Sequence, residues 1–337
     1  MPDAEGLTRV AGIRCIALLA LLAPARAVAA QDIALRYGMA ISAQKSIYSL
    51  PVAVAEREGL FRREGLDFRL VIPLPGGSDK MIDALHDDTV DVTHVATPFL
   101  VRAALAGSDA VAVAAEFNNP IYSLVARPDI AKIADLRGKV VGLADPGGSI
   151  TISIRKLLEL RGLSEADIQV RTIEGTPARL SCLQRGECAA VPLGQPQDLV
   201  AASEGYRVLG VSTEAVPEFV YTVTAVRRSW AAAHPDAVVR YVRALAAAFA
   251  IIRDPSRRAS VAKIIVETTG VAPGIAERTL ALYFEPERKV LPMRGEIDMK
   301  GFARVIAFMG EAGQLRAPLP APERFVDTRY LRDAGVR

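Results

Sequence analysis

The tetrapeptide PGGS occurs twice in this 337-residue chain, at residues 75–78 and again at residues 146–149. In both places an apolar run precedes the tetrapeptide and a helix-patterned run follows it. Because one order of strand, glycine turn and helix start is written twice, the sequence predicts two matching α/β units. We expect the two turns to face each other across a cleft and to hold one small ligand between them.

Short apolar runs alternate with helix-period segments from Ile33 onward, a pattern typical of α/β sheets with crossover helices. The first unit has predicted strands at residues 33–40, 67–73, 91–96 and 110–117. The second has predicted strands at residues 139–145, 168–174, 188–194 and 206–211. Predicted helices connect them, at residues 50–61, 79–88, 98–107, 150–163, 176–187 and 196–205.

Two extended segments, residues 116–127 and 217–228, are predicted to cross between the units. Two crossings form a hinge about which lobes can close, which a single flexible linker does not provide. The chain beyond Arg228 reads as helices only, and we expect it to pack back onto one unit. The predicted lobes are therefore residues 31–121 together with 222–337, and residues 122–221.

The first 30 residues predict a cleaved secretory signal. Arg9 and Arg14 flank the start of an apolar run, residues 15–23, and small residues follow it. The run is far shorter than the roughly 20 residues that a bilayer span needs. We therefore expect a mature protein that begins near residue 31 and works in the periplasm.

Charge gives no sign of a nucleic-acid partner. Removing residues 1–30 takes away three arginines, one aspartate and one glutamate, so the net charge falls from +3 to +2. The remaining Lys and Arg residues are scattered along the chain instead of forming a basic cluster.

Two cysteines remain after that segment, Cys182 and Cys188. In an oxidising compartment they could form a disulfide, or each could be a small buried residue. No metal site is expected, because the three histidines, His86, His94 and His234, are far apart and none has ligand spacing with a cysteine.

The glycine turns suggest a binding site and not a catalytic one. A glycine turn before a helix brings backbone N–H groups close to a ligand, and the helix start adds unpaired donors. Ser78 and Ser149 stand where N-cap residues belong, so each turn can serve as a cradle for an anion or a carbonyl. The chain lacks the phosphate-binding pattern G-x-x-x-x-G-K-[ST] and the G-x-S-x-G elbow of serine hydrolases. No catalytic set is found, and His94 is interpreted as a strand-packing residue.

Other candidate ligand contacts come from loops that follow predicted strands. Such loops meet at one edge of an open α/β sheet, where ligands bind. The polar residues they offer are Ser42, Gln44, Lys45, Tyr48, Thr97, Asn118, Thr176 and Gln195.

Several stretches together resemble a known family, the periplasmic substrate-binding proteins of ABC importers. The most specific are "AEREGLF", "ADLRGKVVGL", and a helix followed by "GE" and "AAVPLG". The resemblance runs from about Ile33 to Asp327, within the group that binds nitrate, sulfonates, taurine and thiamine precursors (NMT1/THI5-like). It implies a two-lobed type II binding-protein fold and a monomer that captures a small organic, anionic ligand for an ABC permease and its ATPase. The ligand-binding residues it implies are Gln44, Tyr48, Gly77, Ser78, Thr97, Asn118, Ser149, Thr151 and Gln195.

The sequence also departs from parts of that family. The cysteine-rich motif of the pyrimidine-synthesising relatives is absent, which argues against their enzymatic activity. No arginine falls in a loop expected at the site, so a charged ligand would rely on backbone donors at the two helix starts. No cofactor is expected. Two alternatives remain on the same fold: an extracytoplasmic enzyme, with Lys45 as a cofactor lysine, and a sensory ligand-binding module.

Overall fold

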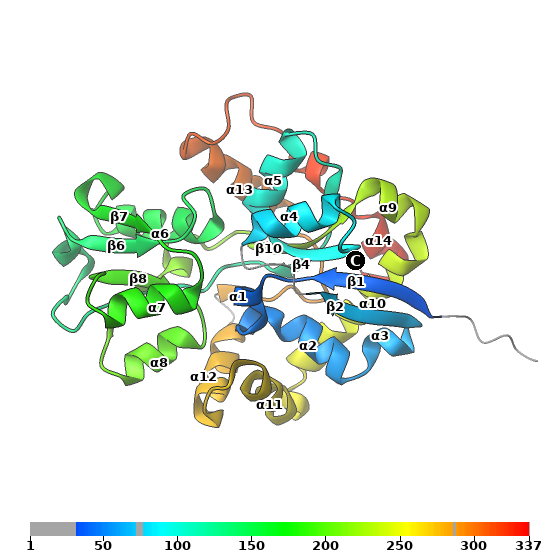
Figure 1. Ribbon diagram of the computed structural model, residues 1–337, viewed down its shortest axis with the longest axis horizontal. Helices are drawn as coiled ribbons and strands as arrows, with labels where there is room; N and C mark the ends of the chain where they lie inside the picture. The colour runs from blue at the N-terminus through cyan, green and yellow to red at the C-terminus, as the bar shows by residue number, and fades with distance from the viewer. Residues whose placement is uncertain (1–31, 72–76, 286–287, 337) are drawn as a thin grey trace, which may run out of the picture. The chain divides into compact units, whose positions relative to one another are not determined.

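The computed structural model describes residues 32–71, 77–285 and 288–336. The predicted signal, residues 1–30, lies outside the described residues, and so does the start of the first PGGS turn, Pro75 and Gly76. Within the described ranges no helix is long and apolar enough to cross a membrane. The predicted α/β class is confirmed, because the chain forms two five-stranded sheets with helices packed on them (Figure 1).

The first sheet has the strand order β2-β1-β3-β10-β4. Strand β1 pairs in parallel with β2 and β3, whereas β10 runs antiparallel between β3 and β4. The strands are β1 Ile33–Gly38, β2 Leu66–Val71, β3 Val92–Ala96, β4 Ala110–Phe117 and β10 Thr222–Arg227. Every residue of β3 and of the edge strand β4 is buried.

The second sheet repeats this arrangement, with the order β7-β6-β8-β5-β9. Strand β6 is parallel to β7 and β8, and β5 runs antiparallel between β8 and β9. The strands are β5 Ser123–Ala126, β6 Val140–Leu143, β7 Gln169–Thr172, β8 Ala190–Leu193 and β9 Arg207–Val211. The duplication predicted from the two PGGS turns therefore extends to strand order and direction.

The two extended segments become the antiparallel strands of the two sheets. The chain leaves β4 of the first sheet and enters β5 of the second, and it leaves β9 and returns into β10. Asn119, in the outgoing segment, donates from its side-chain amide to the carbonyl oxygens of Pro217 (2.8 Å) and Arg288 (2.7 Å). The backbone N–H of Tyr221 donates to Phe117 and Asn118. These bonds hold the two crossing segments side by side.

Helices connect the parallel strands, and in Figure 1 α4 and α5 lie above the first sheet while α2 and α3 lie below it. One predicted helix, residues 50–61, is in fact two, because Gly59 adopts a left-handed conformation (φ 66°) between α2 and α3. The connecting helices of the first sheet are α1 Ile41–Gln44, α2 Leu50–Arg57, α3 Leu60–Arg63, α4 Ser78–His86 and α5 Thr97–Leu105. Those of the second sheet are α6 Ser149–Leu160, α7 Thr176–Gln184 and α8 Gln197–Ser203.

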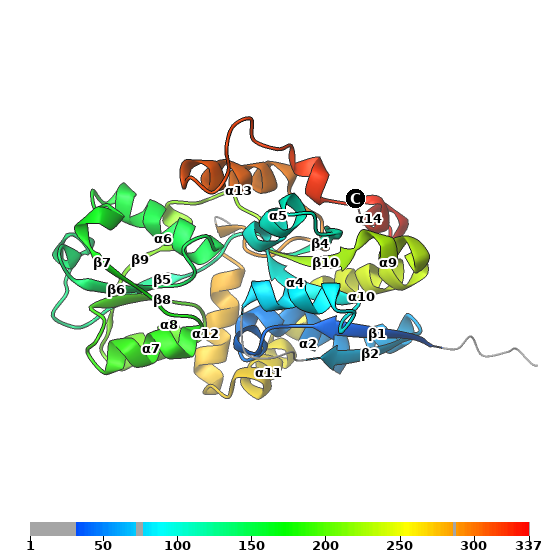
Figure 2. The same cartoon turned by 45° about the horizontal axis from the view of Figure 1, so that its top comes forward.

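The chain after β10 is helical, as the sequence predicts. It forms α9 Arg228–Ala233, α10 Pro235–Arg253, α11 Arg258–Thr269, α12 Pro273–Tyr283, α13 Met299–Glu311 and α14 Arg329–Asp333. Helix α10 packs against α2, α3 and α14, and α11 also contacts α2 (Figure 2). Helices α12 and α13 additionally contact α8 and α6 of the second sheet. The helical region thus connects to both sheets, with its longest helix on the first.

Cys182 and Cys188 form a disulfide with a Cα–Cα distance of 5.4 Å, which resolves the alternative that the sequence leaves open. Both residues are buried in a small apolar cluster with Val125, Leu183 and Val191. The bond joins the end of α7 to the residues just before β8.

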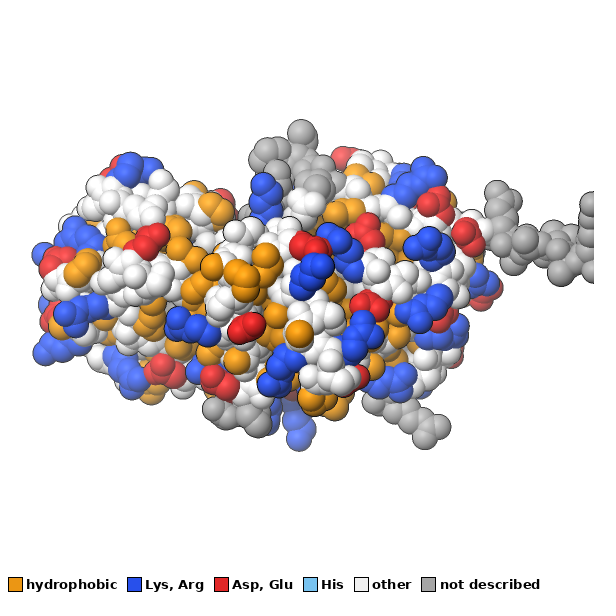
Figure 3. Space-filling view, turned by 90° about the horizontal axis from the view of Figure 1, so that it is seen from below, with side chains coloured by type: hydrophobic (Ala, Val, Ile, Leu, Met, Phe, Trp, Pro, Cys, Tyr) orange, Lys and Arg blue, Asp and Glu red, His pale blue; other side chains and the backbone are white. Residues whose placement is uncertain are grey.

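The molecular surface carries charges of both signs. On the face shown in Figure 3, Lys and Arg side chains alternate with Asp and Glu side chains, and apolar side chains are exposed between them. This face has no continuous basic stripe of the kind that follows a nucleic-acid backbone.

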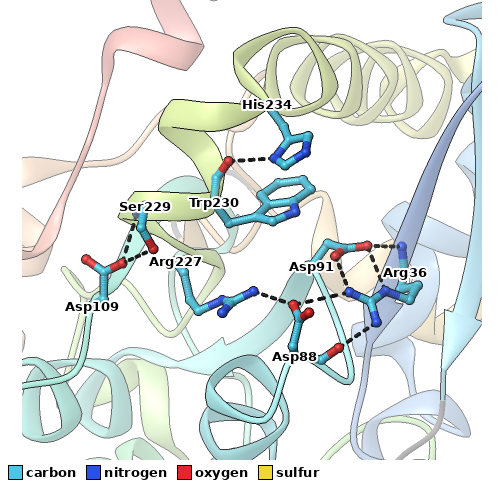
Figure 4. A network of polar contacts seen from close by, with 8 residues as sticks. All are labelled: Arg36, Asp88, Asp91, Asp109, Arg227, Ser229, Trp230 and His234. Atoms are coloured by element: carbon cyan, nitrogen blue, oxygen red, sulfur yellow. Dashed lines mark hydrogen bonds and ion pairs between the residues drawn. The ribbon is translucent and has the colours of Figure 1, made fainter.

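A polar network stabilises the end of the first sheet at which β3 and β4 begin (Figure 4). Arg36 on β1 binds Asp91, with 2.6 Å between Nη2 and Oδ1, and it also contacts Asp88. Arg227, at the end of β10, pairs with the same Asp88. Asp109 accepts the backbone N–H and the hydroxyl of Ser229. This network connects β1 and β10 with the residues that precede β3 and β4, at the end of the sheet opposite the carboxyl ends of β3 and β4.

Candidate functional site

A cavity of about 120 Å³ is lined by residues that follow the parallel strands of both sheets. This is the edge at which open α/β sheets bind ligands. The first sheet and its connections contribute Ala40, Ala43, Ser46, Tyr48, Gly77, Ser78, His94, Ala96, Phe99, Tyr221 and Thr222. The second sheet and its connections contribute Tyr122, Ala144, Asp145, Gly148, Ser149, Ile150, Glu174, Gly175, Thr176, Arg179, Gly194 and Gln195.

Both PGGS turns reach this cavity, but the predicted N-caps are wrong by one residue. Gly77 and Gly148 are the N-caps of α4 and α6, and Ser78 and Ser149 are the first helical residues. The physical reason is that each glycine adopts the extended conformation of an N-cap, which moves the serine into the helix. Among the described residues neither helix start has a side-chain cap, so backbone N–H donors and the positive end of each helix dipole are available there.

Two hydroxyls in the lining are buried without a hydrogen-bond partner among the described residues. They are Ser149 Oγ at the start of α6 and Thr222 Oγ1 at the start of β10, in residues that are each 1% exposed. Ser78 differs, because its hydroxyl accepts the backbone N–H of Ala96 (2.9 Å). Buried polar atoms normally have a partner. The two unpartnered hydroxyls therefore leave unused hydrogen-bonding capacity in the wall of the cavity.

Arg179 places a guanidinium in the lining, and the residue is only 1% exposed. Its guanidinium donates to the carbonyls of Pro192 (2.8 Å) and Ile173 (3.1 Å) and to the hydroxyl of Thr176 (3.0 Å). Among the described residues no carboxylate lies within ion-pair distance of it. Burial lowers the pKa of Arg179, although arginine stays protonated in proteins. A buried cation without an anionic partner is costly, so a negatively charged ligand group would stabilise this site.

Sequence reasoning missed Arg179, because no arginine was expected in a loop at the site. The residue lies inside the first turns of α7 and not in the loop before it. A signal was present, since Cys182 and Leu183 follow Arg179 at the i+3 and i+4 spacing that marks one helix face. Both of those residues are buried, and Arg179 shares their inward direction.

Three tyrosines form another part of the lining that was not predicted as a set. Tyr48 stacks on Tyr122 with ring centroids 5.9 Å apart and meets Tyr221 edge-on at 5.1 Å. The hydroxyls of Tyr122 and Tyr221 are hydrogen-bonded at 3.1 Å. Burial raises the pKa of all three, so at neutral pH they are uncharged hydroxyls. Since Tyr122 and Tyr221 lie in the two crossing segments, the cluster connects these segments to the cavity.

Gln195 lines the cavity, but most of its hydrogen-bonding capacity is used by the protein. Its side-chain N–H donates to Asp198 (2.7 Å), and its oxygen accepts the hydroxyl of Tyr283 (3.1 Å). Asp198 also accepts the hydroxyl of Ser123 (2.6 Å), and burial raises the pKa of this carboxyl. One amide N–H of Gln195 remains to face a ligand.

Two carboxylates stand on the more exposed side of the cavity. Asp145 accepts the N–H of Gly147 (2.8 Å) and lies 3.7 Å from Arg102. Glu174 follows β7 and lines both this cavity and a neighbouring one of about 450 Å³. The lining is therefore electrically asymmetric, with the cation of Arg179 buried inside and acidic groups toward solvent.

The predicted site residues divide into two sets. Tyr48, Gly77, Ser78, Ser149 and Gln195 line the cavity. Gln44, Thr97, Asn118 and Thr151 do not. Gln44 lines a separate cavity with Lys45, because α1 turns it away from the sheet edge. The hydroxyl of Thr97 donates to the carbonyl of Tyr221 (3.3 Å), and Thr97 itself does not reach the cavity.

Asn118 and Thr151 are close to the site, but their side chains do not line the cavity. The backbone N–H of Asn118 donates to Val290 (2.7 Å), so this residue belongs to the crossing segment and not to the lining. Thr151 is on the inner face of α6 and is 1% exposed, two residues beyond Ser149. A spacing of two on a helix turns its side chain about 200° away from that of Ser149.

A histidine in the lining and the possible metal ligands bear on the chemistry of the site. His94, interpreted from the sequence as a strand-packing residue, lines the cavity with its Nδ1 2.7 Å from Glu116. Among the described residues, no group of three or more His, Cys, Asp or Glu could hold a metal ion.

The fold and the site define a class. Two duplicated α/β sheets with a cavity at their carboxyl edges form the periplasmic binding protein fold. The chain belongs to the NMT1/THI5-like family, whose model matches residues 46–258.

Solved structures with the same fold include two sulfonate-binding proteins and one nitrate-binding protein. The alkanesulfonate-binding protein SsuA from Xanthomonas axonopodis, bound to MOPS, is 21% identical, covering 88% of this chain and 99% of its own, with a TM-score of 0.70. The aliphatic sulphonate binding protein SsuA from Escherichia coli is 20% identical over 89% and 99%, with a TM-score of 0.69. The nitrate-binding protein NrtA from Synechocystis is 14% identical over 91% and 89%, with a TM-score of 0.74. No curated protein matches the chain.

Proposed function

We propose that this protein is the solute-binding component of an ABC import system, which captures one small organic anion in the cavity and delivers it to a membrane permease. The family and the names of the similar structures, which bind sulfonates and nitrate, support this proposal. The protein binds its ligand without chemical turnover and acts as a monomer.

The buried guanidinium of Arg179 is the observation that carries the proposal. It provides a cation at the inner end of the cavity, and it retains N–H groups beyond the three that bind protein oxygens. The uncapped starts of α4 and α6 and the free hydroxyls of Ser149 and Thr222 add uncharged donors. A carboxylate or sulfonate offers the matching set of acceptor oxygens.

We further propose that the two sheets belong to two lobes that close on the ligand. The lobes are residues 31–121 with 222–337, and residues 122–221. Motion occurs at the crossing segments, next to Asn119 and Tyr221. Residues 1–30 direct the chain to the periplasm and are removed.

The ligand class is tested by thermal shift on residues 31–337. The panel is benzoate, methanesulfonate and nitrate, with benzamide as the uncharged counterpart of benzoate. A ligand present at one hundred times its Kd adds about 2.7 kcal/mol, which raises Tm by about 4 °C in a chain of this size. We expect a shift with at least one anion and none with benzamide.

An equal shift with benzamide, or no shift with any anion, would contradict anion capture. Mass spectrometry of the bound anion after incubation separates binding from catalysis, since a binding protein returns it unchanged. Uptake of the labelled anion by cells with and without the protein separates import from sensing.

A further inference from the structure

His94 connects the cavity to a buried carboxylate. It lies on β3, and its side chain lines the cavity although the residue is only 6% exposed. Its Nδ1 is 2.7 Å from Oε2 of Glu116 on β4, which is completely buried. The pair therefore lies between the core of the first sheet and the proposed binding site.

Glu116 is held by donors on three sides. Besides His94, it accepts the hydroxyl of Tyr37 (3.1 Å) and the hydroxyl of Thr224 (2.8 Å). Hydrogen bonds donated to a carboxylate favour its ionised form. An ionised Glu116 requires a proton on Nδ1 of His94, because only an N–H at that position makes the 2.7 Å contact favourable.

Because Nδ1 of His94 is hydrogen-bonded to Glu116, the other ring nitrogen, Nε2, is available to contact a ligand. Nε2 has no hydrogen-bond partner among the described residues, and it is not among the buried atoms that lack one, so it keeps access to the cavity. In neutral His94 this nitrogen presents a lone pair, which repels an anion. In protonated His94 it presents an N–H, which binds one.

Because of the charges around the cavity, protonation of Nε2 of His94 depends on whether an anion is bound. In the empty cavity the cation of Arg179 opposes a second positive charge, whereas a bound anion offsets Arg179 and attracts an imidazolium. Glu116 favours the same protonated state from behind. The other titratable or charged groups that face the pair or the cavity are Tyr37, Tyr48, Tyr122, Tyr221, Tyr241, Asp145, Glu174 and Arg179.

We propose that His94 is a specificity-determining residue of the anion site and that binding transfers one proton from solvent to its Nε2. Glu116 is the positioning residue for this step. The inference rests on the proposed function, since it assumes that the ligand is an anion. It adds that the site takes the anion together with a proton, so affinity falls as pH rises.

The test is isothermal titration calorimetry with benzoate, methanesulfonate and nitrate. Each titration is run near pH 7.5 in two buffers of different ionisation enthalpy, and the difference in heat gives the number of protons taken up. We expect about one proton per bound anion for the wild type, because the bound anion offsets Arg179 and stabilises an imidazolium at His94. Since binding takes up that proton, Kd should rise by up to about tenfold per pH unit.

Three variants separate the role of His94 from that of Glu116. His94→Gln keeps an amide N–H toward Glu116 but cannot be protonated, so proton uptake should vanish and affinity near pH 6 should fall at least about tenfold. Glu116→Gln should retain uptake only at lower pH, a change in the pH profile that a purely structural role would not produce. His86→Gln, at an exposed histidine bonded to Ser108, is the control and should match the wild type.

The outcomes separate the two proposals. Anion binding with no proton uptake, or with the same uptake in His94→Gln as in the wild type, overturns the role of His94 and leaves the proposed function intact. Failure of all three anions to bind the wild type overturns both. Should Glu116→Gln fail to fold, the His94→Gln and His86→Gln pair still decides between these results.

Discussion

Replacing Cys182 and Cys188 together with alanine should lower stability by an amount set by the loop they close. The disulfide joins residues separated by 6 positions, so it closes a short loop in the unfolded chain. The chain-entropy relation gives about 2 kcal/mol for a loop of this length. With unfolding entropy proportional to chain length, this corresponds to a fall in Tm of about 3 °C.

The assay is a thermal melt of the wild type and the double variant, each with and without a thiol reductant. We expect the reductant to lower the Tm of the wild type to that of the variant and to leave the variant unchanged. Equal Tm values of the wild type and the double variant without reductant would show that the disulfide adds nothing to stability, contrary to this prediction.

The bond also bears on the site. It fastens the end of α7 to the residues before β8, and Arg179 of α7 donates to Pro192 on that strand. The double variant should therefore bind anions more weakly than the wild type but more tightly than a variant without Arg179. Titration calorimetry with benzoate measures that order.

Two further predictions concern packing and pH. A Cβ on Gly194 would lie 3.2 Å from the ring of Tyr122, so Gly194→Ala should displace that ring and weaken anion binding several-fold in titrations; Gly274→Ala, with no atom within 4 Å, is the matched control. Partial burial would raise the pKa of Asp109, but the hydrogen bonds from Ser229 outweigh it and lower that pKa. The folded state therefore holds its proton more weakly than the unfolded state, and Asp109 stabilises the fold above the ordinary aspartate pKa. Ser229→Ala should lower Tm at neutral pH and have a vanishing effect as melts are carried to acid below the lowered pKa, whereas an equal loss at every pH would contradict this account.

Much of the fold was predictable because its signals are local. The strands β3 and β4 are short and rich in alanine and β-branched residues, and the repeated PGGS turns indicate two units of the same order. The predicted helix over residues 50–61 was too long because Gly59 looks like any helix-interior glycine until its positive φ is known. The disulfide could not be decided, since the pattern of Cys182 and Cys188 suits a bond and separate burial equally.

The site was less predictable, because it depends on side-chain direction. Loop position placed Tyr48, Ser78, Ser149 and Gln195 at the cavity, since the carboxyl ends of parallel strands converge. It misplaced Gln44, whose helix turns outward. Arg179 was missed because it lies on a helix, where an arginine is ordinarily a solvated residue.

The most direct test of the central claim is titration calorimetry of benzoate, methanesulfonate and nitrate with Arg179→Gln and with Arg185→Gln. Arg185 follows α7, is exposed and pairs with Glu187, so its variant controls for loss of a positive charge on the same element. Arg179→Lys retains the charge and covers the case in which Arg179→Gln does not fold. We expect Arg185→Gln to bind as the wild type does and Arg179→Gln to bind at least about tenfold more weakly. Wild-type affinity in Arg179→Gln would contradict the assignment of this cavity as an anion site.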